Sequence, residues 1–256
     1  MPTWDPAQYL RFGDHRLRPA LDLMARIALD APRTIHDLGC GPGNVTGLLE
    51  QRWPAARITG VDGSPDMLAR ARASYPTLAW QQADLDTWRP EEPGDLIFSN
   101  ATLHWLDEHE RFFPRLMACL EPGGVLAVQM PDNFAAPTHT LIGEIVRGGG
   151  WRTRLEPALR PHPVLAPAAY HDILLPHARS LDIWQTTYLH VLEGENPVVE
   201  WTKGSVLRPI LDRLRDEEET SAFLRAYGDG IRRAYPRRAD GRTLLPFGRL
   251  FIIAVR

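Results

Sequence analysis

The sequence predicts an α/β fold in which two outer layers of helices cover a mostly parallel β-sheet. Over roughly the first 130 residues, short apolar segments alternate with amphipathic helical segments. Strand–helix–strand repeats of this kind form parallel strands joined by right-handed crossovers. A glycine-rich turn at residues 39–43 follows the first apolar segment, and the second apolar segment ends at Asp62. These two features predict a ligand-binding edge at the carboxyl ends of the strands.

Helix starts are marked by proline in the first turn and by side chains suited to N-caps. Ser64 followed by Pro65 is the strongest such signal, with Ser64 as the N-cap. Strands are indicated by short apolar runs bounded by turn residues. We therefore expect helices at residues 6–12, 19–29, 44–52, from 65 onward and 106–120, and strands at residues 34–38, 57–61, 78–82, 95–98 and 123–130.

The alternation stops after residue 130, and residues 131–180 are rich in Pro, Gly and His, with a hinge-like stretch at 148–151. We expect one ligand-binding domain over residues 1–256, with a helical cap at 1–30. Helical insertions at 131–180 and 193–240 are expected to form a lid over the substrate site, because ligands bind at this edge of such sheets. The expected elements after residue 180 are strands at 181–192 and 250–255 and helices at 197–203, 207–214 and 217–235.

Composition limits the possible partners. The chain has 256 residues and a formal net charge of −3, so no general positive field attracts nucleic acid or an anionic membrane. Two cysteines, Cys40 and Cys119, are too few for a disulfide framework and fit a reducing compartment. No secretory leader or membrane-spanning run is indicated. We expect a cytoplasmic protein that is a monomer or weak homodimer and uses no membrane or nucleic acid.

The glycine-rich turn and Asp62 indicate a particular nucleoside. Asp37 leads a G-x-G-x-G turn rather than the G-x-G-x-x-G turn of dinucleotide-binding proteins. An acidic residue there suits a ligand with an ammonium or sulfonium group and would repel a diphosphate. This arrangement resembles the S-adenosylmethionine loop of class I methyltransferases, which have a three-layer Rossmann-like fold with a seven-stranded sheet. A glycine turn that binds no ligand is the alternative.

Other cofactor contacts follow from this resemblance. Asp62 is placed to accept hydrogen bonds from the ribose hydroxyls, Asp84 to bind the adenine amino group and Leu85 to pack on the adenine ring. Asp84 could instead be an ordinary turn cap. Cys40 is explained better by small size than by a catalytic thiol. The full set of expected cofactor-binding residues is Asp37, Gly39, Cys40, Gly41, Asn44, Asp62, Gly63, Met67, Asp84, Leu85, Asn100 and Trp105.

Two absences from the sequence argue against two classes of methyltransferase. Asn100-Ala101-Thr102-Leu103 lacks the Asn/Asp-Pro-Pro-aromatic motif of enzymes that methylate nucleic-acid bases. No acidic or histidine cluster has metal-ligand spacing, so no metal is expected. His104 follows, and it is either a general base or a structural histidine. Trp105 is expected to pack near the cofactor.

Basic residues are candidates for an anion site, although nearly all are arginines, and Lys203 is the single lysine. Arg16 and Arg18 are two residues apart and would point in different directions on a helix. Arg208 precedes Pro209, which predicts that Arg208 is held outside helical angles. A guanidinium in a fixed direction could grip a carboxylate with two hydrogen bonds.

Nearly the whole chain resembles the trans-aconitate 2-methyltransferase family, a bacterial branch of class I. The segments that carry the resemblance are residues 8–19, 37–44, 129–133, 137–139, 201–209, 234–236 and 240–242. The resemblance implies esterification of one carboxylate of a small tricarboxylate. An ionised carboxylate needs no general base, so no catalytic residue is expected beyond a possible role of His104. The expected substrate-binding residues are Arg18, Lys203, Arg208, Arg16, Asn133 and His139.

Three other readings stay open at this point. The chain could methylate another small carboxylic acid on the same scaffold. It could bind S-adenosylmethionine without transferring the methyl group, although the intact set of Asp37, Asp62 and Asp84 argues against this. A nicotinamide-dependent oxidoreductase is disfavoured by the spacing of the glycine turn.

Overall fold

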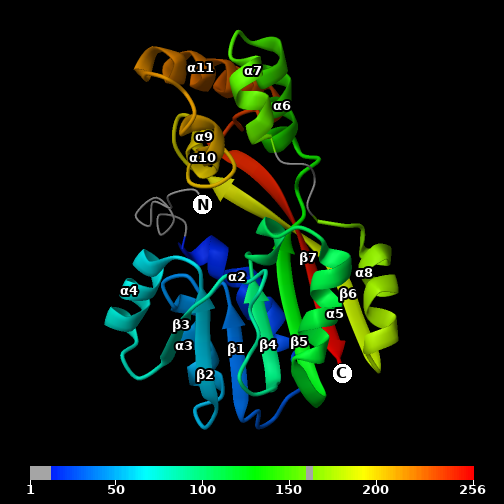
Figure 1. The fold of residues 1–256 in the computed structure, drawn as a ribbon. Coiled ribbons are helices and arrows are strands. Elements are labelled where there is room, and N and C mark those ends of the chain that lie inside the picture. Colours follow the sequence, from blue (N-terminus) through cyan, green and yellow to red (C-terminus); the bar gives the residue numbers. More distant parts are fainter. Residues whose placement is uncertain (1–12, 160–163) are drawn as a thin grey trace. The chain divides into compact units, whose positions relative to one another are not determined.

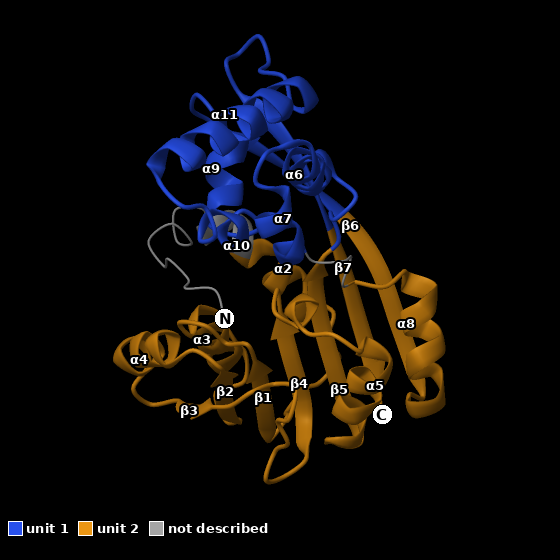
Figure 2. Cartoon of the chain, turned by 45° about the horizontal axis from the view of Figure 1, so that its top comes forward, with its two compact units in different colours: residues 1–16, 132–162, 187–248 blue, residues 17–131, 163–186, 249–256 orange. Residues whose placement is uncertain are grey.

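The computed structural model describes residues 13–159 and 164–256, with side chains from residue 17 onward (Figure 1). The expected helix at residues 6–12 and residues 8–12 of the matching segment at 8–19 lie outside the described residues. The described chain divides into two compact units (Figure 2). Among the described residues, the larger unit comprises residues 17–131, 164–186 and 249–256, and the smaller unit comprises residues 13–16, 132–159 and 187–248.

The sheet has seven strands, as the resemblance to class I methyltransferases implies, and its strand order is β3-β2-β1-β4-β5-β7-β6. The pairs β1–β2, β1–β4, β2–β3 and β4–β5 are parallel, and β5–β7 is antiparallel. The strand order reverses between β1 and β4, which makes their carboxyl ends the expected ligand site. The strands are β1 (Thr34–Leu38), β2 (Arg57–Asp62), β3 (Ala79–Gln82), β4 (Gly94–Asn100), β5 (Leu120–Pro131), β6 (Ser180–Leu192) and β7 (Thr243–Val255).

Helices cover both faces of the sheet because the crossovers run in two directions. Right-handed connections from β1 to β2 to β3 place α3 (Asn44–Arg52) and α4 (Pro65–Ser74) on one face. The connection from β4 to β5 runs the other way and places α5 (His109–Ala118) on the opposite face. The central strand β4 is apolar on both sides, with Leu96, Ile97 and Phe98 fully buried, as expected for a strand covered by two layers.

The helix starts were predicted with mixed success. Ser64 caps α4 by accepting a hydrogen bond from the Met67 N–H, with Pro65 at the first helical position, as predicted. The helix expected at 19–29 is instead α2 (Gly13–Ala25), with Pro19 inside it. The helix ends early because the last amides turn back to carbonyls three residues away, Arg26 N–H to Leu23 O and Ile27 N–H to Met24 O.

The helix expected at 106–120 is shorter in the structure, where α5 spans His109–Ala118. Glu108 before it has a φ of 53°, a left-handed conformation that no residue inside a right-handed helix adopts. The helix therefore begins three residues later than expected. A short 3₁₀ helix, η1 (Leu103–Trp105), precedes this start.

The smaller unit has an apolar core of its own. Phe223 and Tyr227 from α11 pack there with Ile142 and Val146 from α6 and with Trp201 from α9. Helices α6 and α7 in the smaller unit and α8 in the larger unit lie in the segment at 131–180, which the sequence predicts to be a helical insertion without locating its individual helices. The elements of this half of the chain are α6 (Pro137–Gly148), α7 (Arg152–Leu155), η2 (Glu156–Ala158), α8 (Pro167–Leu174), η3 (Leu175–His177), α9 (Pro197–Lys203), α10 (Arg208–Leu211) and α11 (Glu217–Ala234).

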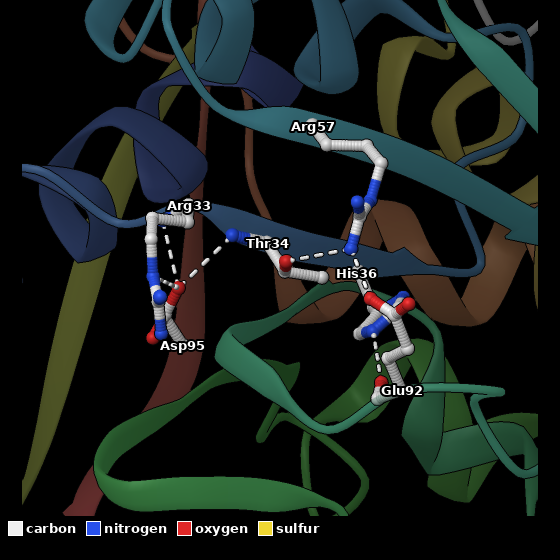
Figure 3. Close-up of polar contacts among 6 residues, drawn as sticks. All are labelled: Arg33, Thr34, His36, Arg57, Glu92 and Asp95. Atoms are coloured by element: carbon white, nitrogen blue, oxygen red, sulfur yellow. Dashed lines mark hydrogen bonds and ion pairs between the residues drawn. The ribbon is translucent and has the colours of Figure 1, made fainter.

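The amino ends of β1, β2 and β4 are held by a polar cluster (Figure 3). Asp95 accepts the backbone N–H groups of Arg33 at 2.7 Å and Thr34 at 3.0 Å. Arg57 donates to the Thr34 hydroxyl at 3.1 Å and pairs with Glu92. These contacts satisfy the backbone at the edge of the sheet that lies opposite the expected ligand site, so we assign the cluster a structural role.

Candidate functional site

The turn after β1 depends on glycine for its conformation. Gly39, Gly41 and Gly43 have φ values of 72°, 54° and 87°, which side chains rarely adopt. A Cβ on Gly39 would lie 2.1 Å from Cγ2 of Thr102, so a side chain there would collide with the loop after β4. A Cβ on Gly41 would meet no described atom within 4 Å. The loop is therefore closed against the protein at Gly39 and open at Gly41, where a ligand can approach the backbone.

Trp80 supports this turn and was missed by the sequence analysis. Its ring would lie 2.6 Å from a Cβ on Gly43 and 2.4 Å from one on Gly60. Gly60 and Trp80 are register partners on β2 and β3, and the indole N–H donates to the Tyr75 carbonyl at 3.2 Å. In the sequence, Gly60 is a signal for this contact, because a glycine on a strand leaves room for a large ring on the next strand. It can be interpreted only once the pairing of Gly60 with Trp80 is known.

Asp37 is the buried acidic residue of the site. It lies at the end of β1, is 2% exposed and accepts a hydrogen bond from Thr46 Oγ1 at 2.6 Å. Burial in a medium of low polarity disfavours the ionised form and raises the pKa of Asp37 to about 7, while the hydrogen bond from Thr46 opposes the shift. This carboxyl can therefore change its charge near neutral pH when a cation binds beside it.

Asp62 holds the loop through both of its carboxylate oxygens. Oδ2 accepts the Gly41 N–H at 2.9 Å and Oδ1 accepts the Ser64 N–H at 2.8 Å. Each carboxylate oxygen has a second lone pair, so Asp62 can accept two further hydrogen bonds from a ribose without losing these. Its position at the end of β2 is the one that the sequence predicted.

Asp84 forms the turn after β3. Its Oδ1 accepts the Asp86 N–H at 3.0 Å, and its carbonyl accepts the Thr87 N–H at 3.2 Å. The turn-cap role is thus present, and the second carboxylate oxygen retains its capacity for a ligand. Leu85 and Met67 are both buried beside this edge.

Cys40 has the environment of a structural residue. Its thiol is buried, and burial with the nearby Asp37 and Asp62 carboxylates raises its pKa. A thiol that stays protonated is a poor nucleophile. This environment is consistent with the prediction that Cys40 occupies the turn because it is small and not because its thiol is catalytic.

The loop after β4 brings a third group of residues to the same edge. Ala101 has a φ of 54°, a strained value for a residue with a Cβ. Thr102 donates to the Gly39 carbonyl at 3.2 Å and ties this loop to the glycine turn. Oδ1 of Asn100 is buried and accepts no hydrogen bond from any described residue. An unsatisfied buried acceptor beside the turn fits a ligand that donates hydrogen bonds, such as an ammonium group.

All twelve expected cofactor-binding residues belong to the larger unit. They follow the carboxyl ends of β1, β2, β3 and β4 and the helices that begin there: Asn44 opens α3, Gly63 precedes α4, and Trp105 closes η1. His104 is 8% exposed, and its ring centroid lies 4.9 Å from that of Trp105. The burial of His104 fits a structural histidine, and its role in catalysis stays a prediction.

The expected substrate-binding residues are divided between the units. Arg18 lies in the larger unit, with a side chain 71% exposed and an ion pair to Asp22 at 3.9 Å. Lys203, Asn133 and His139 lie in the smaller unit together with Arg208. Arg16 lies on α2, and its side chain is outside the described part of the structure. A common site for these residues stays a prediction.

The four residues of the smaller unit have different surroundings. Lys203 is paired with Glu200 at 2.6 Å. His139 lies on the first turn of α6, with Nδ1 3.1 Å from the Thr138 hydroxyl. Asn133 is 7% exposed, and its Oδ1 has no hydrogen-bond partner among the described residues. Asn133 is the most buried of the four and the one with an unsatisfied acceptor.

The prediction that Pro209 keeps Arg208 out of helical angles is wrong. Arg208 is the first residue of α10, and Leu207 before it is also in the right-handed helical region. A proline near a helix start costs little, because the amide it lacks has no partner within the helix. Arg208 is paired with Asp212 at 2.9 Å on the same helix.

Gln129 and Arg249 were not among the expected site residues. Gln129 is fully buried near the end of β5, and Arg249 on β7 is 5% exposed. Arg249 Nη1 donates to Gln129 Oε1 at 3.5 Å. Both residues belong to the larger unit.

The described residues lack two kinds of feature. They contain no group of three or more His, Cys, Asp or Glu residues that could hold a metal ion. No helix among them is both long and apolar enough to cross a membrane.

Comparison with known proteins identifies the family. Residues 35–124 match the family described as a methyltransferase domain. The chain is 52% identical over 256 residues to the trans-aconitate 2-methyltransferase of Azoarcus sp. (strain BH72), with all of both chains covered. It is 49% identical to the enzyme of that name from Methylobacterium radiotolerans, covering 99% of this chain and 98% of the relative.

A solved structure confirms the fold at lower similarity. The phosphoethanolamine N-methyltransferase 2 of Haemonchus contortus, in complex with phosphomonomethylethanolamine and S-adenosylhomocysteine, matches with a TM-score of 0.57 at 15% identity. The match covers 93% of this chain and 52% of that chain. The glycine turn, the strand order and the full-length identity agree, and the chain belongs to the trans-aconitate 2-methyltransferase family of class I methyltransferases.

Proposed function

We propose that this protein transfers a methyl group from S-adenosylmethionine to one carboxylate of trans-aconitate, giving the monomethyl ester and S-adenosylhomocysteine. The observation that carries the proposal is the 52% identity, over the full length of both chains, to a relative named trans-aconitate 2-methyltransferase. The same proposal places the reaction in the cytoplasm and makes it independent of metals, membranes and nucleic acid.

The larger unit has a donor set that fits the cofactor. The open backbone at Gly41 leaves room for the nucleoside, and Asp62 has lone pairs for both ribose hydroxyls. The unsatisfied Oδ1 of Asn100 suits an ammonium group, and the buried Asp37 suits a nearby positive charge. When bound, S-adenosylmethionine supplies an electrophilic methyl group on a sulfonium sulfur.

The protein need not remove a proton from the acceptor. A carboxylate is ionised at neutral pH, and its oxygen is the nucleophile as it stands. The remaining task is to hold that oxygen in line with the methyl group and to exclude water. Without water, the attraction between the carboxylate and the sulfonium, whose charges cancel during the transfer, is stronger. His104 is then a positioning or structural residue.

The other two carboxylates of the substrate require fixed positive charge. Burying them unpaired would be prohibitive, so cations and hydrogen-bond donors must line their site. We propose Arg18, Lys203 and Arg208 for this role. Arg16, Asn133 and His139 are the next candidates. The ion pairs of Lys203 with Glu200 and Arg208 with Asp212 would have to open or be shared on binding.

The direct test is methyl transfer from labelled S-adenosylmethionine to trans-aconitate, with cis-aconitate, citrate and isocitrate assayed in parallel. Selective ester formation on trans-aconitate is the expected result. The matched control is Asp62→Asn, which should lose cofactor affinity and turnover together.

Three other outcomes would replace the proposal. Turnover of a different acid, with none of trans-aconitate, would keep the reaction and change the substrate. Cofactor binding without any ester across a broad acid screen would indicate a binding protein. Tighter binding of a nicotinamide dinucleotide than of S-adenosylmethionine would contradict the cofactor.

A further inference from the structure

Two buried polar residues lie at the carboxyl edge of the sheet on strands that the sequence analysis did not assign to a site. Gln129 on β5 is fully buried, and Arg249 on β7 is 5% exposed. Arg249 is the register partner of Pro131, which lies two residues after Gln129 on the same strand. Residues two apart on a strand, and partners across neighbouring strands, point to the same face of the sheet. The two side chains therefore share a face, and Arg249 Nη1 donates to Gln129 Oε1 at 3.5 Å.

This contact determines which groups of the pair can serve a ligand. The amide oxygen of Gln129 is occupied by the guanidinium, which leaves the amide nitrogen as the free end. Nε2 of Gln129 is buried and has no hydrogen-bond partner among the described residues. An amide N–H₂ donates only, and a guanidinium donates only and stays charged. The pair thus offers hydrogen-bond donors with positive charge, which is the chemistry of a carboxylate site.

The pair also lies beside the expected cofactor site. Asn100 is the register partner of Gln129 on the adjacent strand β4, and the Ala101 N–H donates to the Gln129 carbonyl at 2.9 Å. Asn100 presents an unsatisfied acceptor and Gln129 an unsatisfied donor. Neighbouring strands therefore provide opposite polarities at one edge, an acceptor for a cationic group and donors for an anionic one.

We infer that Gln129 and Arg249 bind a carboxylate of the acid substrate and determine specificity for it, an inference that rests on the proposed function. Arg249 supplies the charge and Gln129 a directed hydrogen bond. Among the described arginines, exposure separates this one from Arg18, whose side chain is 71% exposed. A buried cation binds a carboxylate much more strongly than an exposed one, because solvent does not screen the pair.

The test is a set of steady-state assays on the intact protein with Arg249→Gln, Arg249→Lys, Gln129→Leu and Gln129→Glu. Arg256→Gln, immediately after the end of β7, is the control for the loss of one positive charge. Each variant is assayed with trans-aconitate, and its affinity for S-adenosylmethionine is measured by calorimetry. Three dicarboxylates that each lack one carboxylate of trans-aconitate, namely glutaconate, mesaconate and itaconate, are assayed as alternative substrates or competitive inhibitors.

We expect Arg249→Gln to raise the KM for trans-aconitate about 100-fold, the scale of removing one partner of a buried charge pair. Arg249→Lys should recover part of this loss, Gln129→Leu should show a smaller effect, and Gln129→Glu should repel the substrate. Cofactor affinity should stay within about twofold in every variant, and Arg256→Gln should behave like the wild type. One of the three dicarboxylates should bind wild type and Arg249→Gln equally, because it lacks the carboxylate that Arg249 holds. A merely structural role of Arg249 would not produce this equality.

The outcomes separate this inference from the proposed function. A wild-type protein that neither binds nor methylates trans-aconitate would overturn the proposed function, and the inference with it. An active wild type whose Arg249→Gln variant keeps the same KM would overturn the inference alone. An equal loss for trans-aconitate and all three dicarboxylates, or a parallel loss of cofactor affinity, would also overturn it, since the effect would then be a general one.

Discussion

Two carboxyl groups on adjacent strands, Asp37 and Asp62, perform different tasks because their burial differs. Asp62 is held by the backbone N–H groups of Gly41 and Ser64, which orient it for a ribose. Asp37 is 2% exposed with the single hydrogen bond from Thr46, and its pKa is raised to about 7. Asp62 is therefore oriented for hydrogen bonding, whereas Asp37 can change its charge.

Cofactor affinity should therefore depend on pH through Asp37. A cation favours the ionised carboxylate, so binding below pH 7 must release a proton from Asp37. We expect affinity for S-adenosylmethionine to rise by up to about tenfold per pH unit as the pH increases from the acidic side to about pH 7, and then to level off. Calorimetry across that range checks this. Asp37→Asn should remove the slope, and a slope unchanged in that variant would contradict the assignment.

The same pKa predicts an opposite trend for the stability of the unliganded protein. The pKa of about 7 in the folded chain lies above the ordinary aspartate pKa of 3.8, so between these values the folded chain holds a proton that the unfolded chain has released. The contribution of Asp37 to stability is complete below about pH 4 and is lost as the pH rises through 7. Cofactor binding thus stabilises the protein most where Asp37 alone stabilises it least.

His104 gives a prediction about catalysis. A carboxylate acceptor needs no base, so His104→Asn should keep kcat within about tenfold of the wild type. Removal of a group that acts as general base would lower kcat by up to about ten-thousandfold. Single-turnover rates at saturating substrate make the comparison, with thermal unfolding of the variant as the control for folding. A drop beyond about a thousandfold would assign His104 a chemical role.

At the scale of elements, agreement with the sequence depends on whether the signal is local. Asn44–Arg52 and Pro197–Lys203 have the predicted bounds, because prolines lie at or within two residues of their ends. Helices α6 and α8 were missed, since each lies in a segment whose prolines and glycines indicate turns. Both begin with proline at the first positions, so these prolines start helices instead of preventing them.

The candidate site divides along the same line. The sequence predicts Asp37, the glycine turn and Asp62, because each lies at the end of one of two consecutive strands. The contact of Gln129 with Arg249 joins positions 120 residues apart, and it exists only because β5 and β7 are neighbours in the sheet. No spacing in the sequence carries that information.

Helix α11 supplies a prediction at this scale. Asp216 caps it by accepting the Glu219 N–H at 2.8 Å, and Glu219 in turn accepts the Arg215 N–H at 2.9 Å. Loss of such a cap costs about 1 kcal/mol. Asp216→Ala should lower the free energy of unfolding by that amount in urea denaturation, whereas Glu218→Ala, in the same turn without a capping bond, should change it little. Equal effects of the two substitutions would exclude a capping role.

At the scale of the whole molecule, the expected cofactor residues all lie in one of the two compact units. Hydrogen exchange can check this assignment. S-adenosylmethionine alone should slow exchange at residues 37–44, 60–67, 84–85 and 100–105 of the larger unit. Residues 197–235 of the smaller unit should exchange at their original rates. Protection that appears first in the smaller unit would contradict the assignment.

The strand order has a consequence for synthesis of the protein. β7 is translated after the other six strands, yet it lies between β5 and β6 in the sheet. While the chain is still emerging from the ribosome, the five parallel strands can assemble, but β6 has no neighbour to join until β7 has been made. The nascent chain must therefore keep β6 unpaired and the edge of β5 open. The last strand closes both at once, so completion of the sheet follows synthesis of nearly the entire chain.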